Sequence, residues 1–260
     1  MIRDNKSGQA LSAQQLAERL AVASRVLVGE QHDNPDHHAL ELWLMQVLAA
    51  RRPQGSLLLE MLNPDQQARV TAVQSDLVQE KYPSDLPVAL SWQKAWDWSL
   101  YGSLMRYLLA QPYPVMSANL DTNEIMPTYR QAPESSGSLS AAPAVHERLL
   151  ALIRDSYGVL PEDRLPALLA VQQQRDRRMA QSLLAAPLPS VLFADAWHVR
   201  KDVGVPLHLA DLGVTEPAVV LLLARMGEEV EPQSADYVWY TAATPEKHSG
   251  AQLHQSPPGA

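Results

Sequence analysis

The chain has 260 residues, of which 46% are hydrophobic, and this is enough to bury one substantial core. Its net charge of -8 argues against a general nucleic-acid-binding surface, which needs clustered basic residues. The absence of cysteine excludes disulfides, zinc sites built from thiolates and thiol catalysis.

The N-terminal part predicts a helix, a buried strand and a second helix. The polar residues 1–10 predict a loose terminus, and the helix after them has Ser12 as a candidate N-cap. RVLVGE, at residues 25–30, is apolar and too short for a helix, so it predicts a buried strand. Asn34 is a favoured residue for the N-cap of the following helix, and Pro35 suits its first helical position.

The same rhythm of strand and helix returns along most of the chain. Further strands are predicted in SLLLEML, PVMSANL, SVLFADAWHV, AVVLLLARM and DYVWYTAA. Helices are predicted over PDQQARVTAVQSDL and from Trp98 to Ala110. Strands separated by helices predict an α/β fold, with a mainly parallel sheet flanked by helices.

The middle of the chain departs from this rhythm. Residues 132–144 are rich in Ser, Pro and Ala and predict a loop, and helices are predicted over about 145–157 and 162–186. We therefore expect a helical insertion or lid at about 130–187 within a single α/β domain spanning 1–260. Residues 245–260 have the composition of a disordered tail.

Polar side chains follow four of the predicted strands. They are Glu30 and His32, Glu60, Asn119, and Asp195 with His198. The carboxyl ends of parallel strands open into one crevice, so we expect these groups to converge. Glu30, His32, Glu60 and His198 could then bind a divalent metal or act as acid and base.

Two further histidines lie at the start of the second helix. His37 is spaced to face the sheet, where a buried neutral histidine is its simplest interpretation. His38 is expected to face solvent or the rim of the crevice. The helical spacing therefore argues against one three-histidine site in this segment.

A second dense segment follows the strand that precedes His198. Arg200 adds positive charge beside that histidine and suits an anionic ligand such as a propionate, with an ordinary salt-bridged loop as the alternative. Tyr129 and Tyr157 flank the irregular middle. Either could ligate ferric haem as tyrosinate, and the sequence does not choose between them.

Six segments occur in the order seen in a known family. They are VLVGEQHDNPDHH, LLLEML, VMSANL, QQQRDRRMA, HVRKDVGVPLHL and DYVWY. The chain resembles the ChaN-like haem-binding lipoproteins, from about Val26 to Tyr240. The wider superfamily of Tiki/TraB and erythromycin-esterase-like proteins shares a GxxH strand end and a glutamate on the next strand, matched here by Gly29, His32 and Glu60.

The resemblance implies a haem-binding protein of bacterial iron or haem uptake. It implies ferric haem held by tyrosine, with support from histidine and arginine, and binding at a homodimer interface. It also implies a periplasmic or outer-membrane lipoprotein and a haem-uptake receptor as partner. The lipid-bearing cysteine is absent from this chain, so membrane attachment would require an anchor that the chain does not contain.

Two functions follow from these patterns. The first is haem binding, with Tyr129, Tyr157, His198 and Arg200 as candidate contacts. The second is a metal-dependent hydrolase, in which Glu30, His32, Glu60 and His198 hold a divalent metal or activate water. We favour the first, which is not an enzyme activity.

Overall fold

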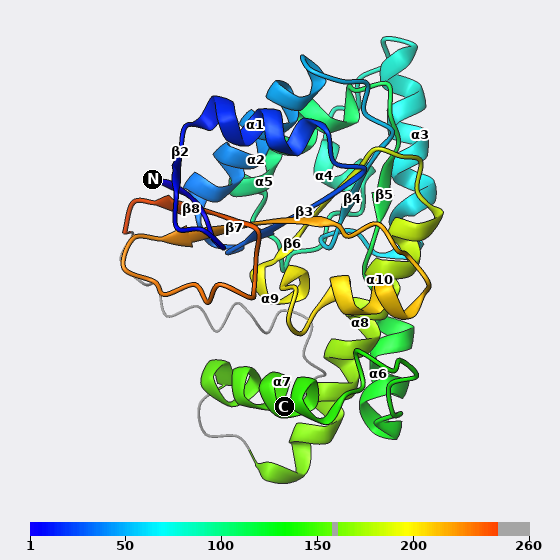
Figure 1. Ribbon diagram of the computed structural model, residues 1–260. Helices are drawn as coiled ribbons and strands as arrows, with labels where there is room; N and C mark the ends of the chain where they lie inside the picture. Colours follow the sequence, from blue (N-terminus) through cyan, green and yellow to red (C-terminus); the bar gives the residue numbers. More distant parts are fainter. Residues whose placement is uncertain (158–160, 244–260) are drawn as a thin grey trace.

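A computed structural model describes residues 1–157 and 161–243, with the side chain of Tyr157 excepted. An eight-stranded sheet forms its centre, in the order β2-β1-β8-β7-β3-β6-β4-β5 (Figure 1). The strands are β1 (Ile2–Asp4), β2 (Ala10–Leu11), β3 (Arg25–Glu30), β4 (Ser56–Leu59), β5 (Val115–Ser117), β6 (Ser190–Asp195), β7 (Val219–Arg225) and β8 (Tyr237–Thr241). Only the pairs formed by β1 are antiparallel among these strands, so the predicted α/β fold with a mainly parallel sheet is confirmed.

Helices cover both faces of the sheet (Figure 1). The α-helices are α1 (Ala13–Ala21), α2 (Pro35–Ala49), α3 (Gln67–Val78), α4 (Leu86–Ala89), α5 (Trp98–Leu109), α6 (Thr122–Gln131), α7 (Pro143–Tyr157), α8 (Leu165–Ala185), α9 (Ala196–Val199) and α10 (Val205–Asp211). Two short 3-10 helices are η1 (Pro64–Gln66) and η2 (Glu162–Arg164). Within the described residues, no helix is both long enough and apolar enough to cross a membrane.

The central strand β3 is buried along its whole length because both of its faces are covered. Val26 and Val28 point to one face and pack with α1, α2, α3 and α5. Leu27 points to the other face and packs with α8, α9 and α10. Because side chains alternate along a strand, the core is divided into two layers, one on each side of the sheet.

The N-caps that the sequence predicts for α1 and α2 are confirmed. Ser12 accepts a hydrogen bond from the Gln15 backbone N–H at 3.1 Å, and the Gln15 side chain accepts one from the Ser12 backbone. Asn34 accepts from the Asp36 backbone N–H at 3.0 Å, with Pro35 as the first helical residue. These caps set where α2 begins, directly after the end of β3.

The prediction of a loose N-terminus was wrong. Residues 2–4 form β1, which pairs antiparallel with β8 and places Ile2 opposite Trp239. The Asn5 side chain donates to the Glu231 carbonyl oxygen at 2.8 Å, and Arg3 donates to the Tyr240 hydroxyl at 3.0 Å. The segment is too polar and short to signal a strand, and the partner that orders it lies more than 200 residues away.

The middle helices form a lobe beyond the sheet edge. Helices α6 and α7 and the first part of α8 project away from the sheet, and the later part of α8 packs back against it (Figure 1). Two small apolar clusters hold the lobe together, and Tyr129 packs half-buried against both. The predicted tail at 245–260 lies outside the described residues.

Asp211, at the end of α10, binds the loop that leads into α7. Its carboxylate accepts hydrogen bonds from the backbone N–H groups of Leu139 and Ser140, both at 2.9 Å, and from the hydroxyls of Ser138 and Ser140. Burial would raise the pKa of Asp211, but these donors lower it to about 2. The carboxylate thus fastens the lobe to the core.

Replacing Asp211 with asparagine should lower the free energy of unfolding by about 1–3 kcal/mol, because bonds to a charged acceptor are lost. The pKa of Asp211 is depressed on folding from 3.8, so its contribution is present above about pH 3.8 and is lost as the pH falls toward about 2. Urea unfolding at pH 3 and pH 6 checks both points, with the exposed Glu216→Gln as control. Equal stability of Asp211→Asn and wild type at pH 6 would contradict this role.

Candidate functional site

Three neighbouring strands bring carboxylates to one edge of the sheet. Because β3, β6 and β4 are adjacent and parallel, Glu30, Asp195 and Glu60 reach the same edge. The register places Glu30 opposite Asp195, and the Glu60 backbone N–H donates to the Phe193 carbonyl oxygen at 3.0 Å. The strand ends converge, as the sequence predicts.

Glu60 lies between two histidines and is 2% exposed. Its Oε2 is 3.6 Å from Nε2 of His32, and its Oε1 is 3.4 Å from Nε2 of His198. Oε2 also accepts a hydrogen bond from the Asp195 backbone N–H at 2.8 Å. Burial would raise the pKa of Glu60, but the two histidines outweigh it and lower the pKa to about 2. Glu60 is therefore a carboxylate in the folded protein.

His32 connects Glu60 to Glu30. Its Nδ1 lies 2.7 Å from Glu30 Oε1 and 3.0 Å from the hydroxyl of Tyr101, and that hydroxyl donates to the same Glu30 oxygen at 2.6 Å. The rings of Trp96 and His32 meet at a steep angle, with their centroids 4.6 Å apart. Burial would lower the pKa of His32, but Glu60 and Glu30 raise it to about 9. Its side chain is 12% exposed.

His198 continues the contacts toward α8. Its Nδ1 is 2.5 Å from Asp176 Oδ1, and the Gln172 amide is 2.9 Å from the same nitrogen. Burial would lower the pKa of His198, but Glu60 and Asp176 raise it to about 10. The histidine is therefore an imidazolium held between two carboxylates.

At the other end, His38 approaches Glu30 from α2. Its Nδ1 lies 3.0 Å from Glu30 Oε2 and 3.1 Å from Glu41 Oε2, and its Nε2 lies 3.0 Å from the His32 carbonyl oxygen. The prediction that His38 faces solvent or the rim was wrong, because it is 3% exposed. The first turn of α2 sits directly against the end of β3, so both of its histidines turn inward.

His37 is buried, as its spacing predicts. Its Nδ1 accepts a hydrogen bond from the Gln31 backbone N–H at 2.9 Å. Burial lowers the pKa of His37 to about 4, so the ring is neutral. It packs against the end of the sheet and takes no part in the contacts of His38.

These contacts form one continuous set, which we call the histidine–carboxylate chain. Its members are Glu41, His38, Glu30, His32, Glu60, His198 and Asp176. Carboxyl groups and imidazoles alternate along it, so each histidine lies between two carboxyl groups, and Glu30 and Glu60 each lie between two histidines. His32 has the most exposed side chain in the set.

A family model described as haem-binding uptake, Tiki superfamily, ChaN matches residues 16–209. The chain belongs to this family. The resemblance predicted from the six segments is confirmed, and the matched region spans the whole histidine–carboxylate chain.

One solved structure agrees with this assignment. ChaN of Campylobacter jejuni, solved with cofacial haem, is 27% identical and superposes with a TM-score of 0.84 over 91% of this chain and 94% of that chain. A Bacillus cereus protein is 12% identical, with a TM-score of 0.43 over 85% of this chain and 70% of that chain. A variant of the erythromycin esterase EreC is also 12% identical, with a TM-score of 0.49 over 87% and 78%. No curated protein sequence matches the chain.

The residues predicted to contact haem lie in different parts of this ChaN-family fold. His198 is 4% exposed and is enclosed by Glu60 and Asp176. Arg200 donates to Asp202 at 2.9 and 2.6 Å and to Glu231 at 2.6 Å, so a propionate would have to displace one of these carboxylates.

Asn119, the remaining polar residue predicted at a strand end, donates to the Glu60 carbonyl oxygen at 3.0 Å and holds the backbone of that strand end.

The helical lobe offers groups that suit haem. Tyr129 of α6 presents a phenol beside an apolar surface, and ferric iron accepts phenolate oxygen as a ligand. At the start of α7, Nε2 of His146 is buried and has no hydrogen-bond partner within residues 1–157 and 161–243. A nitrogen in that state can serve a metal centre. The side chain of Tyr157, the second predicted ligand, is outside the described residues.

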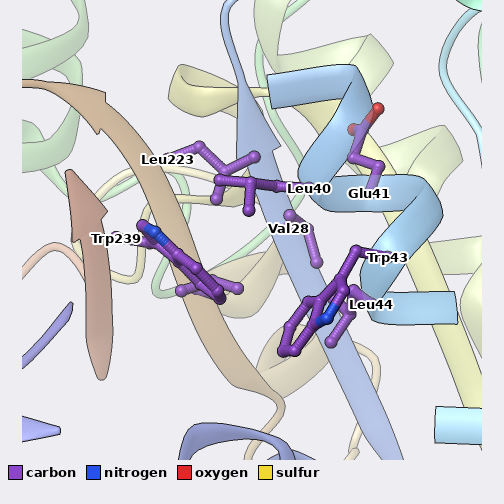
Figure 2. Close-up of a pocket in the computed structure, with 8 residues that line it drawn as sticks. Val28, Leu40, Glu41, Trp43, Leu44, Leu223 and Trp239 are labelled. Atoms are coloured by element: carbon purple, nitrogen blue, oxygen red, sulfur yellow. The ribbon is translucent and has the colours of Figure 1, made fainter. Parts of the chain in front are cut away.

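A small pocket lies between α2 and the sheet (Figure 2). Trp43 and Trp239 meet edge to face at 5.1 Å on its wall, and its other lining residues are aliphatic except Glu41. Its volume is about 200 Å³, below the ~300–1,000 Å³ of typical ligand sites. A haem does not fit there.

Sequence reasoning missed three members of the site. Tyr101 lies in the tryptophan-rich segment, where core packing was the expected role. Glu41 follows His38 by three residues on one helix, a spacing that could have signalled a pair. Asp176 lies within QQQRDRRMA, where its charge looks like part of a solvated helix face. It is 0% exposed in the structure.

Proposed function

We propose that this ChaN-family protein binds ferric haem in bacterial iron or haem uptake. The observation that carries the proposal is the similarity to Campylobacter jejuni ChaN, which covers 94% of that chain and whose structure was solved with cofacial haem. A tyrosine of the lobe is the proposed axial ligand, and Tyr129 and Tyr157 are the two candidates. We propose His146 as an additional polar contact, since its Nε2 lacks a partner.

A haem titration tests the proposal. We expect ferric haem added to the protein to develop the absorption spectrum of a tyrosinate-ligated iron. One of the two variants Tyr129→Phe and Tyr157→Phe, the one that removes the axial ligand, should abolish that spectrum and weaken haem binding, because the iron then loses its anionic ligand. Tyr82→Phe is the matched control, since Tyr82 is exposed and lies outside the lobe.

Absence of saturable haem binding by the wild type would refute haem binding itself. If haem binds but its spectrum is unchanged in both single variants and in the double variant, tyrosine ligation is refuted instead.

Because the haem of Campylobacter jejuni ChaN is cofacial, we propose that this protein forms a homodimer when it binds haem. Two stacked haems need two protein surfaces, one on each outer side. Light scattering during the titration should show the mass doubling with haem and reverting when haem is removed. A constant monomer mass at saturating haem would contradict it.

We further propose a location in the periplasm or at the outer membrane, with a haem-uptake receptor as partner. Uptake is the role given in the family description. Fractionation of the source bacterium with an antibody to this chain checks the location, and a cytosolic signal alone would exclude it.

A metal-dependent hydrolase is the second candidate function. The observation that favours it is the contact of Glu30, His32, Glu60 and His198 in one buried set that opens at His32. His32 could exchange a proton with a bound substrate while Glu60 and Glu30 hold its charge. A screen of ester and peptide substrates with His32→Gln as control tests it. Turnover that is lost in His32→Gln supports the enzyme, and no turnover with or without added divalent metal counts against it.

A further inference from the structure

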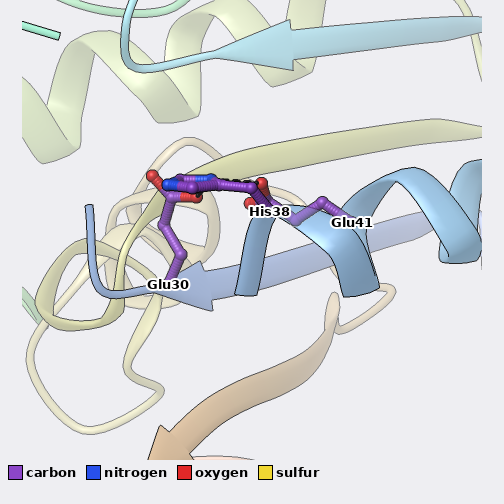
Figure 3. A group of neighbouring side chains, drawn as sticks. All are labelled: Glu30, His38 and Glu41. Atoms are coloured by element: carbon purple, nitrogen blue, oxygen red, sulfur yellow. Dashed lines mark hydrogen bonds and ion pairs between the residues drawn. The ribbon is translucent and has the colours of Figure 1, made fainter. Parts of the chain in front are cut away.

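Glu30, His38 and Glu41 form a compact group at the buried end of the histidine–carboxylate chain (Figure 3). Glu30 ends β3, and the other two lie one turn apart on α2. Each is at most 3% exposed. One donor atom of each lies within 4.8 Å of the others, and no other three His or carboxylate side chains of the described residues are placed in this way.

The hydrogen bond of His38 to the backbone determines which of its ring nitrogens faces the carboxyl groups. The His32 carbonyl oxygen can only accept, so His38 Nε2 must carry a hydrogen. Burial would lower the pKa of His38, but Glu30 and Glu41 raise it to about 11, so Nδ1 carries a proton toward Glu30 Oε2 and Glu41 Oε2, at 3.0 and 3.1 Å. A divalent cation that binds here takes the place of this proton.

The spacing of these atoms suits a metal ion. Zinc lies about 2.0–2.2 Å from imidazole nitrogen and carboxylate oxygen, so two ligands of a tetrahedral zinc are ~3.4 Å apart, and two ligands at right angles on an octahedral ion are ~3 Å apart. The Nδ1 of His38 lies 3.0 and 3.1 Å from the two carboxyl oxygens, so the octahedral separation is already present and the tetrahedral one needs an outward shift of a few tenths of an ångström. Glu41 Oε1 is buried and has no hydrogen-bond partner in the described parts of the chain, so it can supply a further donor.

The surroundings also match those of a metal ligand. A histidine that binds metal through one nitrogen usually donates its other N–H to a carbonyl or carboxylate, as His38 does to His32. Glu30 is held by its second oxygen, which accepts from Tyr101 at 2.6 Å. The donor atoms are therefore oriented before any ion arrives.

We propose that Glu30, His38 and Glu41 bind a divalent cation of the zinc or manganese class. The donor set of one imidazole and two carboxylates suits these ions. Burial and the neighbouring Glu30 raise the pKa of Glu41, so Glu41 releases a proton when a dication binds, and the two carboxylates then compensate its charge. This site shares Glu30 with the metal set predicted from the sequence, but His32, Glu60 and His198 take no part in it. It is also independent of the haem proposal, which concerns the helical lobe.

Metal content and titration of matched variants test the site. Wild-type protein stripped with chelator is titrated with Zn²⁺ and with Mn²⁺, and bound metal is counted by mass spectrometry after desalting. We expect one equivalent of at least one of the two ions in the wild type, and roughly 100-fold weaker binding in Glu41→Gln. Glu60→Gln and the helix-surface change Asp36→Asn should bind as the wild type does.

The outcomes separate the two possible sites. Loss of metal in Glu41→Gln with retention in Glu60→Gln supports the proposal. Loss in Glu60→Gln with retention in Glu41→Gln overturns it, and so does a wild type that binds neither ion.

A second measurement needs only the wild type and applies if Glu41→Gln does not fold. Imidazole nitrogen resonances are compared before and after Zn²⁺ is added. We expect His38 Nδ1 to lose its proton and shift as a metal ligand. A proton that remains on this nitrogen at saturating Zn²⁺ would overturn the site.

Discussion

Replacing Glu60 with alanine is expected to lower the free energy of unfolding by about 3–5 kcal/mol. The carboxylate lies 3.6 Å from His32 and 3.4 Å from His198, and its removal leaves two buried imidazolium groups without their shared partner. It also leaves the Asp195 backbone N–H without an acceptor. Chemical denaturation at neutral pH, followed by circular dichroism, measures the loss.

Glu60→Gln is the matched control, because it keeps an oxygen acceptor for Asp195 and removes only the charge. Its free energy of unfolding should fall by less than that of Glu60→Ala. A loss below about 1 kcal/mol in the alanine variant, the level of an exposed ion pair, would show that the histidines are not held as charged groups.

The Glu60→Ala variant should also change how the free energy of unfolding depends on pH. The pKa of His198 rises from 6.5 to about 10 on folding, so its contribution is full below about pH 6.5 and is lost as the pH rises toward 10. The pKa of Glu60 falls from 4.5 to about 2, so its contribution is full above about pH 4.5 and is lost on acidification. Glu60→Ala should therefore flatten the decline between pH 6.5 and 10, with Asp176 preserving part of it.

Replacing Gly29 with alanine is expected to cost about 3 kcal/mol or more. A Cβ atom at this position would lie 2.5 Å from Leu222 Cδ2, 2.6 Å from Val199 Cγ2 and 2.8 Å from Ala196 Cα. The last of these is backbone of α9, so a change of side-chain rotamer cannot remove the clash. The glycine allows α9 to pack directly on the strand and brings His198 within reach of Glu60.

Thermal melting and denaturation of Gly29→Ala measure this cost. Gly227→Ala is the control, because a Cβ there meets nothing within 4 Å and only the positive φ of 98° is penalised, by about 1 kcal/mol. If the folded Gly29→Ala protein kept wild-type stability, close packing of α9 on β3 would be refuted.

Much of the fold follows from local patterns in the sequence. Short apolar runs between capped helices predicted an α/β sheet, and the polar residues that end them predicted where Glu30, Glu60 and Asp195 would meet. These inferences hold because parallel strands have their carboxyl ends at one edge, whatever the details of packing.

Other features depend on how helices are rotated and seated on the sheet. Glu41 of α2 and Asp176 of α8 join the histidine–carboxylate chain, and Tyr101 of α5 donates to it at Glu30. No local pattern states which side of a helix meets a strand end. His38 was misplaced for this reason, since its spacing along α2 is compatible with the rim or the interior. The pairing of β1 with β8 escaped prediction because its partner is far along the chain.

The sequence by itself therefore determined the α/β class, the capped helices, the family and the polar strand ends. Only the tertiary structure decided that these ends extend into a buried line of alternating charges, and that Glu30, His38 and Glu41 face one another at its closed end. The physical reason is the separation along the chain of the residues that interact. Secondary structure and strand alternation are set by neighbouring residues, whereas the pairing of buried charges depends on contacts between segments far apart in the chain, which only the packed core brings together.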